Sequence, residues 1–176
     1  MSKRIGIYSG SFDPIHDGHL AFAQEALKIC NLNEVIFLPE QAPRDKPNVT
    51  KIDERIDLIA AKIITIPNLS VLQLSTAQFN VAETLPILQT KFPDSEFTLL
   101  VGSDVVRTFE YRWEDLNILL SSVSLAIGMR TGDDSVEIED ILFELEKDFK
   151  SAISYTLIYT DHSHIASSHI RKNRLN

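Results

Sequence analysis

Residues 10–19, with the sequence Gly-Ser-Phe-Asp-Pro-Ile-His-Asp-Gly-His, constrain the fold of this chain more than any other segment. They come one residue after the apolar run Ile-Gly-Ile-Tyr at residues 5–8. This order predicts a β-strand that breaks into a loop and then enters a helix. Gly10 and Gly18 let the backbone approach a ligand closely, and Pro14 stiffens the turn, so the loop is suited to binding a phosphate group.

Two histidines of this segment, His16 and His19, stand three residues apart, so both rings can lie on one side of the first helical turn. Beside a helix N-terminus they form a site for an anion. Metal coordination is the alternative, and the histidines that could then join them as ligands are His162, His164 and His169. We assign no metal ligand, because the glycines and Pro14 suit phosphate better than a closed coordination shell.

The composition is that of an ordinary globular protein, with 44% hydrophobic residues among 176, and we expect one domain spanning residues 1–176. A formal net charge of −8 argues against nucleic acid as a partner, so an anionic substrate must meet a local basic patch. Cys30 is the only cysteine, which excludes an internal disulfide. The first apolar run is too short for a signal peptide and no stretch is long enough to span a membrane, so we expect a cytoplasmic protein without membrane contact. Homo-oligomerisation stays open.

Short apolar, β-branched runs alternate with segments of helical periodicity along the whole chain. The predicted strands are residues 4–8, 34–38, 70–74, 97–101, 123–128 and 155–159. The predicted helices are residues 20–30, 53–65, 83–91, 113–120 and 135–149. This alternation predicts an α/β fold, a Rossmann-like parallel sheet with helices on both faces, in which ligands bind beyond the carboxyl ends of the strands.

Local signals set some boundaries. Thr50 and Asp53 resemble a helix-capping box, and Pro86 is expected in a first helical turn, which places the start of the third helix near Glu83. Residues 40–50 are polar and carry Pro43 and Pro47, and they are expected to form a mobile flap over the site.

A second motif lies near the C-terminus, at residues 165–171, with the sequence Ile-Ala-Ser-Ser-His-Ile-Arg. Ser167 and Ser168 can cap a helix and bind phosphate oxygens through free backbone amides, and Arg171 one turn later supplies a planar cation. Taken alone, this pattern is more often a simple helix cap.

Together the two motifs resemble those of the HxGH nucleotidylyltransferases. Residues 10–19 fill every fixed position of the pattern G-x-F-D-P-x-H-x-G-H, and residues 165–171 resemble I-S-S-T-x-I-R, with Ala166 for the first serine and Ser168 for the threonine. Gly102-Ser103-Asp104, Arg112-Trp113 and the turn after Met129 resemble further elements of bacterial nicotinate-nucleotide adenylyltransferases. Residues 43–46, Pro-Arg-Asp-Lys, stand where that family carries P-P-H-K.

The resemblance implies a role for each matching residue. The residues expected to be catalytic or to neutralise phosphate charge are His16, His19, Lys46 and Arg171. Asp104 is expected to contact the ribose of ATP. The residues expected to bind ATP are Gly10, Ser11, Phe12, His16, Gly18, His19, Gly102, Asp104, Arg130, Ile165, Ser167, Ser168 and Arg171. The residues expected to bind the acceptor are Lys46, Phe109, Glu110, Tyr111 and Trp113.

Three departures bear on the acceptor. The P-P-H-K segment keeps Lys46 but not its histidine, and the S-Y-T segment of the family reads Phe-Asn-Val at residues 79–81. The family's ring-stacking aromatic residue aligns with Glu110, whose charge would repel a nicotinate carboxylate, unless Phe109 or Tyr111 is the stacking residue.

The activity implied by the resemblance is transfer of AMP from ATP to the phosphate of nicotinate mononucleotide, with release of pyrophosphate and with Mg²⁺ carried by ATP. A phosphopantetheine adenylyltransferase, or another HxGH enzyme with a different phosphorylated acceptor, is the alternative within the class. A nucleotide-binding regulatory module without turnover is the alternative outside it.

Overall fold

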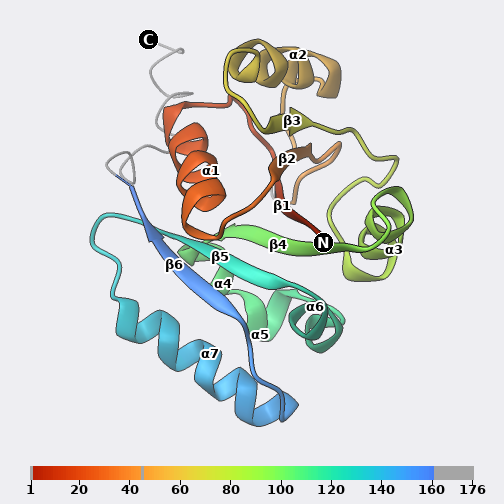
Figure 1. Cartoon of the computed structure of the whole chain (residues 1–176). Helices are drawn as coiled ribbons and strands as arrows, with labels where there is room; N and C mark the ends of the chain where they lie inside the picture. Colours follow the sequence, from red (N-terminus) through yellow and green to blue (C-terminus); the bar gives the residue numbers. More distant parts are fainter. Residues whose placement is uncertain (1, 45, 161–176) are drawn as a thin grey trace.

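Six strands form one parallel sheet in the order β3-β2-β1-β4-β5-β6, in a computed structural model that describes residues 2–44 and 46–160 (Figure 1). The strands are β1 (Lys3–Gly10), β2 (Glu34–Pro39), β3 (Leu69–Val71), β4 (Ser95–Gly102), β5 (Ser124–Met129) and β6 (Tyr155–Tyr159). Each overlaps a predicted strand, so the Rossmann-like fold class is confirmed.

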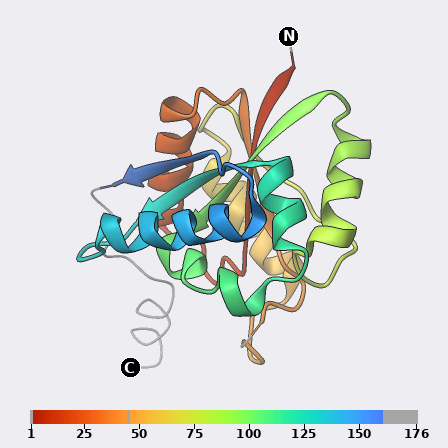
Figure 2. The same ribbon diagram turned by 90° about the horizontal axis from the view of Figure 1, so that it is seen from below.

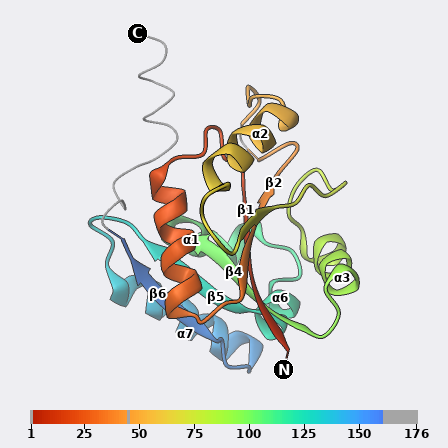
Figure 3. The ribbon, with the colours of Figure 1, turned by 45° about the horizontal axis from the view of Figure 1, so that its top comes forward.

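Seven helices connect these strands within the described residues. They are α1 (Asp17–Ile29), α2 (Ile52–Ile63), α3 (Val81–Lys91), α4 (Ser103–Val106), α5 (Phe109–Arg112), α6 (Leu116–Ser122) and α7 (Ser135–Phe149). One apolar cluster packs α1 and α2 on one face of the sheet, as Figure 3 shows. A second cluster packs α3, α5, α6 and α7 on the other face, and Figure 2 shows α7, in blue, across the sheet from α1. Alternate residues of β1 serve the two faces: Ile5 and Ile7 lie in the second cluster, and Tyr8 packs against the first.

Two helix starts differ from prediction. Helix α3 begins at Val81 and carries Pro86 in its interior, because the Asn80 side chain caps it earlier by accepting from the Glu83 amide at 2.7 Å. Lys51, without a side-chain cap, precedes α2, so the capping box at Thr50 is wrong. The Thr50 amide instead donates to the Asp13 carboxylate at 3.3 Å.

The predicted helix over residues 113–120 is wrong in extent. The chain forms α5 before it, and α6 begins inside it and ends beyond it at Ser122; Trp113 is the extended residue that ends α5. Asp115 then adopts a left-handed conformation, with φ of 55°, immediately before α6. A backbone of this kind interrupts helical hydrogen bonding, so one continuous helix cannot form there.

The strand order fixes where a ligand can bind. From β1 the chain crosses to β2 and β3 on one side, and it later returns to β4, β5 and β6 on the other. The connections that leave the carboxyl ends of β1 and β4 therefore diverge, and they open a crevice between them. The segment at residues 10–19 lies at this switch point.

Candidate active site

A cavity of about 490 Å³ lies at the carboxyl ends of the central strands. Its wall is formed by the β1–α1 loop, the loop after β2, the residues after β4, and the turn after β5. This is the location expected for a ligand in an open parallel sheet.

The β1–α1 loop is shaped by Phe12. This residue has a positive φ of 44°, and its buried ring packs edge-on against Tyr8 at 5.1 Å and Phe37 at 5.2 Å between ring centroids. The buried ring holds the loop against the sheet, and the Asp13–Pro14 bond that follows is cis. Gly10, Ser11 and Gly18 line the cavity around this turn.

The two histidines meet at the start of α1. Their rings stack with centroids 3.7 Å apart, and the backbone amide of His16 donates to Nδ1 of His19 at 3.2 Å. In a neutral His19 ring the proton is therefore on Nε2. Burial is the main cause that lowers the pKa of His19 to about 3 and that of His16 to about 4. At neutral pH both rings are uncharged, and His19 offers an N–H donor from a half-buried position at the cavity.

A buried arginine ties the two loops of this half of the cavity together. Arg55 on α2 is 0% exposed, and its guanidinium donates to the backbone carbonyls of Ser11 at 2.6 Å, Glu40 at 2.8 Å and Thr50 at 2.8 Å. Residue 11 belongs to the β1–α1 loop, whereas residues 40 and 50 are the two ends of the loop between β2 and α2. Arg55 thereby fixes both loops relative to each other.

Lys46 reaches from the second of these loops to the first. Its Nζ donates to the Ser11 hydroxyl at 2.7 Å, and both residues line the cavity with the histidines. A cation, two neutral imidazoles and backbone amides at a helix start together form a site for phosphate oxygens. The mobility expected of residues 40–50 stays a prediction.

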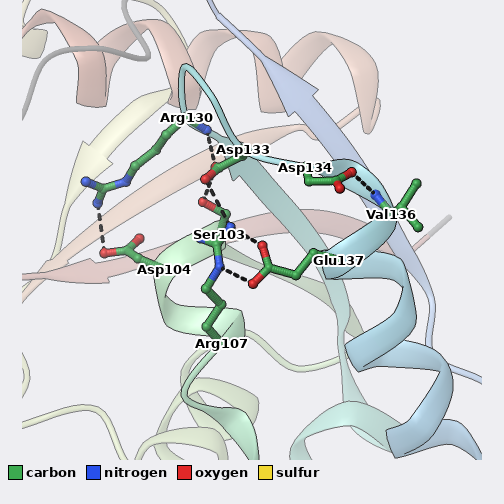
Figure 4. A network of polar contacts seen from close by, with 8 residues as sticks. All are labelled: Ser103, Asp104, Arg107, Arg130, Asp133, Asp134, Val136 and Glu137. Atoms are coloured by element: carbon green, nitrogen blue, oxygen red, sulfur yellow. Dashed lines mark hydrogen bonds and ion pairs between the residues drawn. The ribbon is translucent and has the colours of Figure 1, made fainter.

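On the far side of the cavity, Asp104 and Arg130 form an ion pair at 2.8 Å (Figure 4). Asp133 fixes the turn that carries Arg130, because its carboxylate accepts from the Arg130 amide, the Ser103 hydroxyl and the Arg107 guanidinium. Burial alone would raise the pKa of Asp133, but these hydrogen bonds outweigh it and lower that pKa below its ordinary value.

The structure brings most of the predicted side chains that it describes to this cavity. The lining includes Gly10, Ser11, Phe12, His16, Gly18, His19, Lys46, Gly102, Asp104, Trp113 and Arg130. Ile165, Ser167, Ser168 and Arg171 lie outside the described residues. Their roles stay predictions.

Three predicted acceptor residues are not brought to the cavity. Phe109 is 1% exposed and packs in the core, edge-on against Trp113, with ring centroids 5.4 Å apart. Glu110 and Tyr111 are exposed on α5 and do not line the cavity. The physical reason is the short helix α5, which turns Phe109 into the core and Tyr111 to the surface and leaves Trp113 at the cavity.

Sequence reasoning did not single out Arg44, Glu40, Phe79 or Arg55 as site residues. The first three line the cavity, and Arg55 acts from behind it. An arginine at an otherwise core-facing position of α2 was the only signal for Arg55.

Within residues 2–44 and 46–160, no group of three or more histidine, cysteine or acidic side chains is arranged to hold a metal ion. In the same part of the chain, no helix has both the length and the apolar character needed to cross a membrane.

The chain is similar in sequence to known nucleotidyltransferases. The family model for cytidylyltransferase-like proteins matches residues 7–173. A probable nicotinate-nucleotide adenylyltransferase from Lachnoclostridium phytofermentans is 32% identical over an alignment of 159 positions, and the alignment covers 86% of this chain and 78% of the relative. Another, from Gemmatimonas aurantiaca, is 31% identical over an alignment of 173 positions, which covers 96% of this chain and 79% of the relative.

Solved structures share the fold. Plasmodium falciparum nicotinic acid mononucleotide adenylyltransferase complexed with NaAD superposes with a TM-score of 0.78 at 20% identity, covering 97% of this chain and 83% of that one. A putative nicotinate-nucleotide adenylyltransferase from Vibrio parahaemolyticus has a TM-score of 0.61 at 18% identity, covering 97% and 93%.

Proposed function

Because this chain belongs to the cytidylyltransferase-like family, we propose that it joins the AMP moiety of ATP to the phosphate of nicotinate mononucleotide. The products are deamido-NAD and pyrophosphate. The observation that carries this proposal is the stacked pair of histidines in the loop at the sheet's switch point, where both line the cavity. The names of the curated relatives favour nicotinate mononucleotide as the acceptor.

We assign the two substrates to opposite sides of the cavity. On the β4–β5 side, Asp104 and Arg130 supply a ribose-binding carboxylate and a phosphate-binding cation, which we assign to ATP. On the β2 side, Lys46 and Trp113 supply a cation and a flat ring, which we assign to the acceptor. The histidines lie between the two halves, where the reacting phosphates must meet.

The reaction proceeds by direct displacement. A phosphate oxygen of the acceptor forms a bond to the α-phosphorus of ATP, and the bond from that phosphorus to the bridging oxygen breaks, so the electron pair leaves with pyrophosphate. The phosphate monoester is already a nucleophile, so no covalent enzyme intermediate is needed. Catalysis then consists of positioning the reactants in line and stabilising the charge that develops.

The hydrogen bonds of the site residues suggest a role for each of them in the reaction. His19 donates from Nε2 to an α-phosphate oxygen, since its Nδ1 is occupied by the His16 amide. His16 contacts a second phosphate group. Lys46, held at Ser11, neutralises phosphate charge. Arg171 and Ser168 extend this phosphate site in the prediction from the sequence.

We assign Mg²⁺ as a cation that enters with ATP. The Asp104 carboxylate lines the cavity but is paired with Arg130, so the donor set of the described part fits an ion held chiefly by phosphate oxygens and water. Bound in this way, Mg²⁺ would neutralise charge on the triphosphate.

A product assay tests the proposal. The protein is incubated with ATP, Mg²⁺ and, separately, nicotinate mononucleotide, nicotinamide mononucleotide and 4′-phosphopantetheine, and products are identified by mass spectrometry. We expect a dinucleotide from the pyridine acceptors. Product from phosphopantetheine alone would assign the other adenylyltransferase branch, and ATP binding without product from any acceptor would indicate a regulatory module.

A further inference from the structure

Arg44 is held at the acceptor side of the cavity by two hydrogen bonds. Its Nε donates to Oε1 of Gln78 at 2.8 Å, and its Nη1 donates to the carbonyl of Arg112 at 3.0 Å. Bonds from two different nitrogens fix the plane of a guanidinium. Arg44 lines the cavity, and among the ion pairs of the described residues it has no carboxylate partner.

The two groups that hold Arg44 adjoin two aromatic rings. Gln78 directly precedes Phe79, and Arg112 directly precedes Trp113. Both rings line the cavity, and their centroids are 6.2 Å apart with a tilt of 50°. A flat ring bound against them would bring its substituents close to the Arg44 guanidinium.

One acidic side chain, that of Glu40, is hydrogen-bonded to the backbone of Phe79. Glu40 also lines the cavity, but its Oε1 accepts from the Ser9 hydroxyl at 3.2 Å and from the Phe79 amide at 3.1 Å. These bonds make Glu40 a support for the backbone of Phe79. Both donors are neutral, so Glu40 keeps its negative charge, and Arg44 is a cation held on the same side of the cavity as the two rings.

We propose that Arg44 binds the carboxylate on the pyridine ring of the acceptor and thereby selects the acid over the amide. The inference rests on the proposed function, and it names the residue that distinguishes nicotinate from nicotinamide mononucleotide. A guanidinium forms charge-assisted hydrogen bonds with a carboxylate, and an amide offers only a neutral carbonyl oxygen to the same donors.

Arg44 and Phe79 both stand where this chain departs from the family patterns. Arg44 stands at the second proline of P-P-H-K, and Phe79 at the serine of S-Y-T, in the patterns to which the chain was compared. A different means of recognising the acceptor is therefore expected here, and Arg44 supplies it.

The test compares the acid and the amide acceptor with the full-length enzyme. For Arg44→Gln we expect kcat/KM for nicotinate mononucleotide to fall about tenfold or more, since one charge-assisted contact is lost. The kcat/KM for nicotinamide mononucleotide should change less than about twofold, and the KM for ATP should not change. Arg44→Lys, which keeps the charge but not the fork, should retain part of the preference.

Lys91→Gln is the matched control. It removes one positive charge from the exposed last turn of α3, outside the cavity, and should leave the acid-to-amide ratio unchanged. Thermal melts confirm that each variant is folded.

The outcomes separate the two proposals. If the wild-type enzyme makes deamido-NAD and Arg44→Gln keeps its acid-to-amide ratio, only the role of Arg44 is overturned. If both pyridine acceptors lose the same factor, Arg44 contacts a group that they share, such as the phosphate, and the inference is again overturned. If the wild type accepts neither pyridine nucleotide, the proposed function itself fails.

Discussion

Replacing Arg55 by methionine tests how the cavity is held together. Methionine keeps the apolar stem and much of the volume, but it removes the guanidinium that donates to the carbonyls of Ser11, Glu40 and Thr50. The two loops that these carbonyls belong to would no longer be tied to α2. Because Ser11 and Lys46 contact each other across those loops, the phosphate site would lose its fixed geometry.

The expected cost follows from the three lost hydrogen bonds. Each carbonyl left without its donor costs about 1–3 kcal/mol, and part of this is offset because a buried guanidinium no longer has to be desolvated. We therefore expect the free energy of unfolding to fall by about 2–4 kcal/mol, which lowers Tm by roughly 5–15 °C for a protein of this size.

Thermal melts and steady-state kinetics measure both effects. Arg55→Met should lower kcat and raise KM for both substrates, since the β1–α1 loop and the loop that carries Lys46 both lose their tie to α2. Arg55→Lys should restore only part of the stability and activity, because one ammonium cannot reach three carbonyls. Asp57→Ala, on the exposed face of the same helix, is the control and should change stability by less than about 0.5 kcal/mol. A methionine variant with wild-type Tm and kinetics would refute the reasoning.

Further predictions concern the phosphate site. His19→Ala should lower kcat by about two orders of magnitude while the melt stays close to wild type, because one preorganised donor is lost; a folded variant with near-native turnover would contradict the assignment. The pKa values of His16 and His19 are lowered to about 4 and 3, so the unfolded chain binds more protons than the folded one between these values and about 6.5. Stability to urea should therefore fall as the pH drops from about 6.5 towards 4, and a His19→Gln variant should lose part of that dependence. Asp133→Ala should raise KM for ATP several-fold with a smaller effect on KM for the acceptor, since the turn at Arg130 is released; equal changes for both substrates would count against this role. For Arg171→Ala, KM for ATP should rise more than kcat falls, and normal ATP binding by calorimetry would leave the C-terminal motif as a helix cap.

The positions of the strands along the chain and the phosphate loop could be predicted because their signals are local. Apolar runs of four to eight residues followed by amphipathic segments specify β and α elements directly. The loop at residues 10–19 also carries its chemistry in adjacent positions, so the stacked pair of His16 and His19 follows from their spacing. Asp104 was predicted in another way, from the resemblance of residues 102–104 to a family element.

The acceptor side could not be predicted because its contacts are long-range. Arg44 meets Gln78 and Arg112, which are 34 and 68 residues away in the chain. Likewise, the inward turn of Phe109 depends on how the four-residue helix α5 packs against the sheet, and the sequence pattern of residues 109–113 does not specify it. Such arrangements depend on tertiary packing, which a sequence pattern does not encode.

The most direct test of nucleotidyl transfer follows the label from ATP. The protein is incubated with nicotinate mononucleotide, Mg²⁺ and ATP labelled with ³²P at either the α- or the γ-position, and the products are separated by chromatography. The account predicts that the α-label appears in deamido-NAD and the γ-label in pyrophosphate, in equal molar amounts. Release of the γ-label as inorganic phosphate, or recovery of intact ATP after prolonged incubation, would contradict it.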